Sequence, residues 1–436
     1  MIIFTNTSIE FVEPIFYVIE KILEKSEEYC HSILPTYLQY LISYVAIDKP
    51  IPIGVTNKAL TILLQIGVDK PSIFGSIPHK IFQDFFNLIY KFYNTFFDYN
   101  PNAKKPIFES REMLNEYVET VIKSFELIIH FYVHYPSKCP EENIHPGTRI
   151  SASLTNILNL EKIDGVPPDI GVEVAQQFIK HGIGCVHNLT KGNLIKKDLN
   201  FPIAPPLLDA VLKNLQNPDQ IIVGEALKTL VAACEMHHLS SEYIITSESF
   251  LQFSPIELKE DIYKIHFCNI WAESIYQYTR VQGNSLFPAL GEVTLVNIKK
   301  FSEDVLKLAL DLLKERFEIA SAASLIIMAY FNLNDAEITK FILDKIDDFE
   351  NVVISYFSAQ SDNGKLLFIK ALGHLINYTQ KLAEDDQHST VARNLVENGL
   401  IGELNNIELG VESKELMEFA HALSEELKGA VGGDEE

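Results

Sequence analysis

Apolar residues recur along most of this chain at intervals of three and four, and no sustained alternation of apolar and polar residues interrupts them. Between residues 109 and 133 they form a wide apolar face, which is typical of a helix packed between two neighbours. The pattern predicts an all-α protein. Helices are expected from an opening segment ending near Leu23 and then over residues 32–46, 56–67, 78–97, 109–133, 150–161, 169–187, 205–216, 219–238, 256–280, 301–315, 317–332, 335–347, 363–382, 388–398 and 413–428.

Proline, glycine and asparagine separate these segments. The sequence Asn217-Pro218-Asp219 between two apolar segments predicts the tight turn of a helix pair. A turn-rich break is expected at residues 240–255 and a longer irregular insertion at 134–149. Such an insertion is either a plain surface loop or a loop on a binding face.

One short phrase, Ala-Leu-x-x-Leu, recurs within the helical segments, beginning at Ala59, Ala226, Ala309 and Ala371. The first interval is 167 residues, which is four steps of about 42, a period found in helical repeats of the HEAT or armadillo kind. The last interval, 62 residues, breaks this period, so the repeats are expected to be irregular. Such units bury their apolar faces only by stacking. Burial is predicted for Leu60, Leu63, Leu227, Leu230, Leu310, Leu313, Leu372 and Leu375.

Three stretches carry a family resemblance: Asn217 to Cys234 with Gly224-Glu225-Ala226-Leu227, Ser361 to Leu375, and Val396 to Leu427. They resemble the turns and helices of the armadillo-like superhelix family. The resemblance implies a right-handed superhelical α-solenoid of about ten irregular armadillo/HEAT-like repeats, which binds a partner protein along its concave face.

The importin-alpha branch of that family grips basic peptides with a ladder of Trp and Asn side chains. At the positions matching the ladder this chain has Thr61, Lys228, Asp311 and Gly373 for Trp, and Gln65, Ala232, Glu315 and Asn377 for Asn. Only Asn377 matches. The resemblance therefore concerns the fold, and the ladder is not expected.

Low-complexity linkers do not interrupt the 436 residues, so a single continuous solenoid is predicted over residues 1–428, with a softer junction near 240–255. Residues 429–436 are predicted to form a short acidic tail. The sequence leaves the oligomeric state open.

Negative charge is concentrated in the last third of the chain. The net charge is −23, and residues 301–436 carry 26 acidic against 11 basic side chains. Such a field repels nucleic acid and favours a basic protein or peptide, although a merely solvated surface explains it equally well. Partner-binding candidates are Asp311, Glu315, Glu318 and Asn377.

Five widely spaced cysteines fit a reducing compartment better than a disulfide framework. The acidic N-terminal segment lacks the positive region of a secretory signal. Two stretches without charged side chains, residues 29–47 and 319–334, are interpreted as buried helices and not as membrane spans. A cytoplasmic location is expected, with a nuclear one as an addition.

Candidate chemistry is sparse. The His181, Cys185 and His187 group and the Cys234, His237 and His238 group lack paired ligands at zinc spacing. Phosphate-binding, dinucleotide-binding and nucleophile motifs do not occur, and no catalytic, cofactor-binding or metal-binding residue is assigned.

The sequence therefore favours a non-enzymatic protein-interaction scaffold or adaptor. The alternative is a carrier or regulator of one machine: a transport receptor without the importin-alpha ladder, an Hsp70 exchange factor or a cytoskeletal assembly component. An enzyme with an unrecognised site ranks third.

Overall fold

All regular structure in the part of the chain that the structure describes is helical, and no strand occurs there. The all-α prediction is confirmed for these residues. The computed structural model describes residues 12–25, 53–75, 110–135, 149–163, 166–192, 203–236, 238–280, 288–346, 348–383, 386–410 and 413–432, short pieces between 28 and 41, and the single residues 83 and 87.

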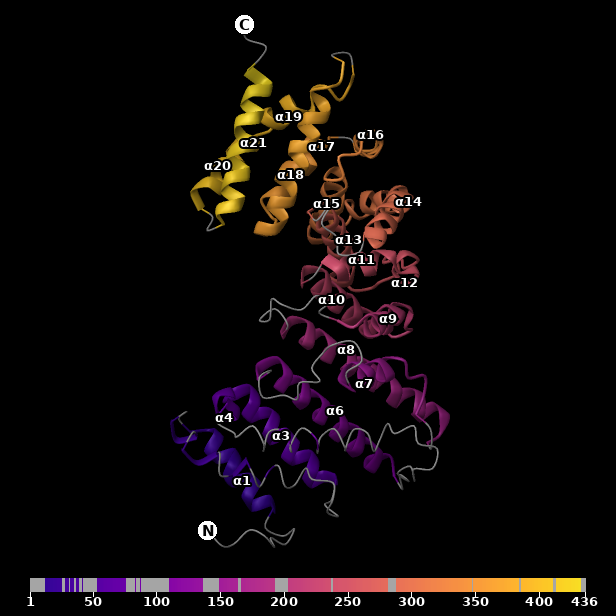
Figure 1. The fold of residues 1–436 in the computed structure, drawn as a ribbon, viewed down its shortest axis with the longest axis vertical. Helices are drawn as coiled ribbons and strands as arrows, with labels where there is room; N and C mark the ends of the chain where they lie inside the picture. Colours follow the sequence, from indigo (N-terminus) through magenta and orange to yellow (C-terminus); the bar gives the residue numbers. More distant parts are fainter. Residues whose placement is uncertain are drawn as a thin grey trace. The chain divides into compact units, whose positions relative to one another are not determined.

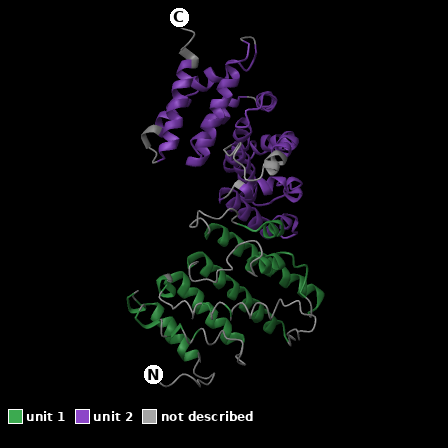
Figure 2. Ribbon diagram, in the orientation of Figure 1, with its two compact units in different colours: residues 1–211 green, residues 212–436 purple. Residues whose placement is uncertain are grey.

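Contacts divide the chain into two compact units, Met1–Val211 and Leu212–Glu436 (Figure 2). The division falls within α9 (Pro205–Lys213). Residues 240–255, the predicted turn-rich break, lie inside unit 2 and contain α11 (His238–Thr246) and α12 (Glu248–Leu251). The polar side chains of Ser240 and Ser241 favoured a turn, but both are buried in α11. The single continuous body stays a prediction.

Unit 1 is built on a series of helices in which each member packs against the next (Figure 1). Polar side chains join the neighbours at the surface. Lys123 on α6 donates to Asn57 Oδ1 and Thr61 Oγ1 on α3, both at 2.7 Å, and Arg111 binds both carboxylate oxygens of Glu173 at 2.7 and 2.8 Å. The series is α1 (Val12–Leu23), α3 (Ile53–Asp69), α6 (Arg111–His134) and α8 (Pro168–Gly192), with α4 (Pro71–Gly75) on α3 and α7 (Arg149–Leu158) on α8.

The predicted helices over residues 32–46 and 78–97 and the predicted insertion at 134–149 lie largely outside the described residues. The five other helices predicted in the first 190 residues are confirmed. Their bounds shift by a few residues.

Unit 2 contains a second series of the same kind, which we call the unit 2 series (Figure 1). Its members are α10 (Gln220–Met236), α13 (Asp261–Arg280), α15 (Phe317–Phe331), α18 (Asp362–Thr379) and α21 (Lys414–Gly432). In the described chain, each packs against the next although other helices separate them in sequence. The five helices therefore pack in the order α10, α13, α15, α18 and α21.

The remaining helices of unit 2 cover this series. Helix α11 packs on α10, α13 and α14, while α14 also packs on α15, and α19 packs on α18 and α21. Aromatic side chains fill the space between: Trp271 is 2% exposed, and its ring lies 5.5 Å from that of Phe250. These helices are η4 (Asn214–Gln216), α11, α12, α14 (Pro288–Leu312), α16 (Ala336–Leu343), α17 (Phe349–Phe357), α19 (Val391–Glu397) and α20 (Leu400–Gly410).

The turn predicted at Asn217-Pro218-Asp219 is confirmed at the start of α10. The backbone N–H of Asp219 donates to Asn217 Oδ1 at 3.0 Å, and that of Ile221 donates to Asp219 Oδ1 at 2.9 Å. Asn217 thus tightens the turn, and Asp219 accepts from a free N–H group in the first turn of the helix. At the other end of unit 2, α21 continues to Gly432, so the predicted tail at 429–436 begins in a helix.

Six of the eight leucines predicted to be buried are buried, but Leu310 on α14 and Leu313 in the turn directly after it are only half-buried. On that helix Leu306, Ala309 and Leu312 face the core instead. The other three copies of the Ala-Leu-x-x-Leu phrase lie on α3, α10 and α18, members of the two series, whereas α14 does not belong to the unit 2 series. The copy at Ala309 is therefore not equivalent to the others, so the intervals that begin or end at Ala309 do not measure a repeat.

Candidate functional site

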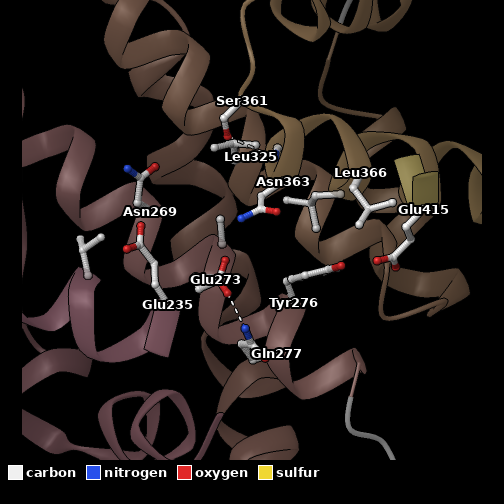
Figure 3. Close-up of a pocket in the computed structure, with 14 residues that line it drawn as sticks. Glu235, Asn269, Glu273, Tyr276, Gln277, Leu325, Ser361, Asn363, Leu366 and Glu415 are labelled. Atoms are coloured by element: carbon white, nitrogen blue, oxygen red, sulfur yellow. Dashed lines mark hydrogen bonds between the residues drawn. The ribbon is translucent and has the colours of Figure 1, made fainter. Parts of the chain in front are cut away.

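A cavity of about 280 Å³ opens on the unit 2 series, and we call it the polar pocket (Figure 3). Its size is near the lower end for ligand sites, which suits one or two side chains. Its described lining residues are Val231, Glu235, Asn269, Ala272, Glu273, Tyr276, Gln277, Leu325, Ser361, Asn363, Gly364, Leu366, Leu367 and Glu415.

Helix α13 supplies one wall. Asn269, Glu273, Tyr276 and Gln277 follow one another at intervals of four, three and one, which places them on one face of the helix. The Gln277 amide donates to Glu273 Oε1 at 2.6 Å, and this bond holds the carboxylate in the pocket (Figure 3). The opposite face of α13 carries buried side chains such as Trp271. A polar stripe thus runs along the face of α13 opposite to its buried side chains.

The opposite wall is the start of α18. Ser361 caps this helix, and its hydroxyl accepts from the Gly364 N–H. Asn363 stands in the first turn, and its side-chain amide points into the pocket (Figure 3). Leu366 and Leu367 provide apolar contact one turn later. Amide groups therefore face the pocket from both walls, so it can satisfy donors and acceptors of a bound polar segment.

Helices α10, α15 and α21 complete the lining. Glu235 comes from the last turn of α10, and Glu415 from the first turn of α21. Leu325 is the contribution of α15, the helix that packs between α13 and α18. The Gln360 amide donates to the Ser321 hydroxyl on α15 at 2.8 Å and fixes the start of α18 beside it.

Three carboxylates, Glu235, Glu273 and Glu415, thus share one small cavity, and none of its described lining residues is basic. Carboxylates in a recess with low-dielectric walls produce a negative potential stronger than the same charges would on a flat surface. The pocket therefore favours a ligand that carries positive charge and hydrogen-bonding groups.

One basic side chain reaches the edge of the pocket. Lys370, on α18, donates to the Tyr276 hydroxyl at 3.3 Å and to Glu415 Oε1 at 3.5 Å. Its ammonium also lies 5.5 Å from the Tyr276 ring centroid and 4.6 Å from that of Phe419. Both distances are within the range of a cation–π interaction.

The four partner-binding residues predicted from the sequence lie elsewhere. Asp311 is exposed near the end of α14 and pairs with Lys314 at 2.9 Å, while Glu315 pairs with Lys264 of α13 at 3.4 Å. The two were expected one turn apart on one helix, but α14 ends at Leu312 and Glu315 lies in the turn that follows. Glu318 is exposed in the first turn of α15.

Asn377 is exposed on α18, where its amide donates to the Gly373 carbonyl at 2.9 Å. Asp311, Glu315 and Glu318 cluster where α14 passes into α15, and no described contact joins Asn377 to them. None of the four is among the described residues of the polar pocket. Their role in partner binding stays a prediction.

In each of the two cysteine and histidine groups considered for metal binding, one member makes another contact, and His237 lies outside the described residues. Cys185 is buried, and His181 lies 3.1 Å from Glu126 on α6. Cys234 lies 3.5 Å from the Ser274 hydroxyl, and burial raises the pKa of its thiol to about 12. Searching the described ranges finds no cluster of three or more His, Cys, Asp or Glu side chains that could bind a metal ion.

Among the described helices, none is both long enough and apolar enough to cross a membrane. The stretch over residues 319–334 that lacks charged side chains corresponds to α15 and its C-terminal turn. Its side chains from Ile326 to Phe331 are buried.

Comparison with known proteins assigns the chain to no family. No family model matches it, and no curated protein matches it. Among solved structures it is similar to an engineered protein, Northeast Structural Genomics Consortium target OR329, with 12% identity over 64% of this chain and 97% of that chain and a TM-score of 0.40. It is also similar to a homology model of the full-length AP-3 complex in an intermediate open conformation, with 12% identity over 99% and 81% of the two chains and a TM-score of 0.26. Neither score is high enough to support a conclusion about fold or function.

Sequence reasoning missed the polar pocket, although part of its signal was present. The stripe of Asn269, Glu273, Tyr276 and Gln277 is visible in the sequence as polar residues on one face of a predicted helix. Glu235 and Glu415 come from segments far away in the chain. Only the packing order of the unit 2 series brings them to the same cavity.

Proposed function

We propose that this protein is a non-enzymatic interaction scaffold of the α-solenoid type that binds a short basic segment of a partner protein in the polar pocket. The observation that carries the proposal is the pocket itself. Three carboxylates and three side-chain amides line it, drawn from helices that pack in series. Carboxylates attract lysine or arginine, and amides hydrogen-bond to an extended backbone.

The solenoid part of the proposal is supported by the two series. In each, helices distant in sequence pack one after another, which is the packing expected of stacked repeat units. We propose that the armadillo-like units inferred from the sequence correspond to members of these series with their covering helices. We also propose a cytoplasmic location, which fits four buried free thiols.

Binding of a labelled peptide of alternating lysine and serine, measured by fluorescence anisotropy, tests this function. The double variant E235Q/E273Q should bind the peptide about three- to tenfold more weakly, because each exposed charge pair contributes about 0.2–1 kcal/mol. The matched control is E257Q/E260Q, which removes two exposed carboxylates of unit 2 outside the described pocket lining.

The control separates the pocket from the general negative charge of the chain. If both double variants weaken binding equally, the peptide responds only to net charge, and the pocket is not its site. The same peptide with acetylated lysines should bind weakly to every variant, because acetylation removes the positive charge.

A further inference from the structure

One end of the polar pocket holds a seat for an ammonium group, made by side chains of two helices, α13 and α21. Tyr276 of α13 and Glu415 of α21 line the pocket, and Phe419 stands one turn after Glu415. We call Tyr276, Glu415 and Phe419 the cation seat. The Lys370 ammonium occupies it, in contact with both rings and near the Tyr276 hydroxyl and the Glu415 carboxylate.

The contacts in the seat are loose for an internal ion pair. Lys370 lies 3.5 Å from Glu415 Oε1, whereas charge-assisted hydrogen bonds are usually about 2.7–2.9 Å long. The Glu415 side chain is 55% exposed, and Phe419 is 39% exposed. The Glu415 carboxylate and part of the Phe419 side chain thus remain exposed to solvent.

The contacts of Lys370 in this seat are only partly shielded from solvent. The Lys370 side chain is 23% exposed and that of Glu415 is 55% exposed, so solvent weakens their pair, and the four-carbon stem of lysine can reorient. The groups that hold the ammonium of Lys370 are those that would hold the ammonium of a bound lysine. An arriving lysine therefore competes with Lys370 for one position.

We propose that the cation seat receives a lysine side chain of the bound segment and that Lys370 is its internal competitor, which lowers affinity for the partner. This proposal rests on the function proposed above and assigns the site of one partner residue. Because Lys370 fills the seat in part of the molecules, the apparent affinity equals the affinity of the free seat multiplied by the fraction of molecules whose seat is free.

The test is the substitution Lys370→Met, which keeps the apolar stem and removes the ammonium. The matched control is Lys365→Met on the same helix, because Lys365 is outside the described pocket lining and its loss changes the net charge equally. Both are measured with the labelled lysine–serine peptide. We expect K370M to bind about three- to tenfold more tightly than the parent and K365M to change affinity by less than about twofold.

A second substitution tests the seat itself. In the K370M background, Phe419→Ala should reverse most of the gain, because it removes one of the two ring faces. Thermal unfolding of each variant checks that α21 stays folded. If a variant that contains K370M does not fold, Lys370→Gln is used in place of K370M.

Equal tightening in K370M and K365M would overturn the proposal, since only net charge would then be acting. Weaker binding in a folded K370M would also overturn it, because Lys370 would then assist the partner. These outcomes are distinct from failure of the proposed function. If the proposed function fails, E235Q/E273Q will bind the peptide with the same affinity as its control E257Q/E260Q, whether or not Lys370 affects binding.

Discussion

Gly224 lies where α10 comes closest to α13. A Cβ added at this position would lie 2.0 Å from Cε1 of the Tyr263 ring, well inside van der Waals contact. Gly373 on α18 is the contrasting case, since a Cβ there would meet no heavy atom within 4 Å. Gly224 and Gly373 both lie in the interior of a helix of the unit 2 series, but only Gly224 has a neighbouring side chain that an added Cβ would meet.

We expect Gly224→Ala to destabilise the protein by about 1–3 kcal/mol through overpacking. Gly373→Ala should stabilise it by about 0.5–1 kcal/mol, because alanine has the higher helix propensity and the added methyl group meets nothing. Chemical denaturation measures both. A stable G224A would show that Tyr263 can move aside at no cost.

The environment of His130 predicts that the stability of unit 1 depends on pH. Its ring lies 4.3 Å from the ring of His134, and burial followed by the charge of His134 lowers the pKa of His130 to about 4. In the unfolded chain His130 binds a proton as the pH falls below its ordinary pKa of 6.5. In the folded chain it binds that proton only near pH 4. The contribution to stability is therefore complete above about pH 6.5 and declines as the pH falls towards 4.

Substitution of His130 by Gln should make the loss of stability between pH 7.5 and pH 4.5 smaller than in the parent. The measurement is the denaturation midpoint at each pH. Substitution of His181, a half-exposed histidine beside Glu126, provides the control. An unchanged pH dependence in the His130 variant would mean that its ring is protonated in the folded state.

At the scale of helices, hydrophobic spacing predicted most of what the structure contains. The long apolar face over residues 109–133 became α6, and the stretch without charged side chains became α15. Starts were less predictable. Helix α14 begins at Pro288, thirteen residues before the predicted start at 301, because proline is favoured at the first helical position and residues 289–300 continue the helix.

Register within a helix was harder to predict than the helix itself. The phrase at Ala309 matches the others in letters, yet Leu310 and Leu313 are half-buried because α14 covers the series and is not a member of it. From Ala226 to Ala371 the chain takes 145 residues over three steps of the unit 2 series. The true step in unit 2 is thus longer than the 42 residues inferred from sequence.

This difference in register predicts a difference in stability. Leu230 on α10 is fully buried, so Leu230→Ala should cost about 2–5 kcal/mol through lost contacts and the cavity left behind. Leu313→Ala deletes the same atoms from a half-buried position and should cost clearly less. Urea denaturation of both variants checks this order, and equal losses would mean that α14 packs more tightly than its exposure indicates.

At the scale of the molecule, the sequence predicted the helical class and the excess of negative charge, but it placed the candidate binding surface elsewhere. Asp311 and Glu315 were selected as acidic residues of the negatively charged last third of the chain, and each has a lysine partner. The polar pocket depends instead on Glu235, Glu273 and Glu415 meeting across helices. That meeting is a consequence of tertiary packing, which spacing within one segment does not encode.

The polar pocket and the surface around Asp311 and Glu315 lead to different predictions for the binding of a basic partner. D311N/E315Q and E235Q/E273Q each remove two negative charges from unit 2, so they change the net charge equally. We expect D311N/E315Q to bind the lysine–serine peptide within about twofold of the parent, because Lys314 and Lys264 already offset these carboxylates locally. Only E235Q/E273Q should reduce the salt dependence of binding measured between 50 and 200 mM NaCl, concentrations over which screening changes markedly. If D311N/E315Q weakens binding more, the turn between α14 and α15 is the partner face that the sequence predicted.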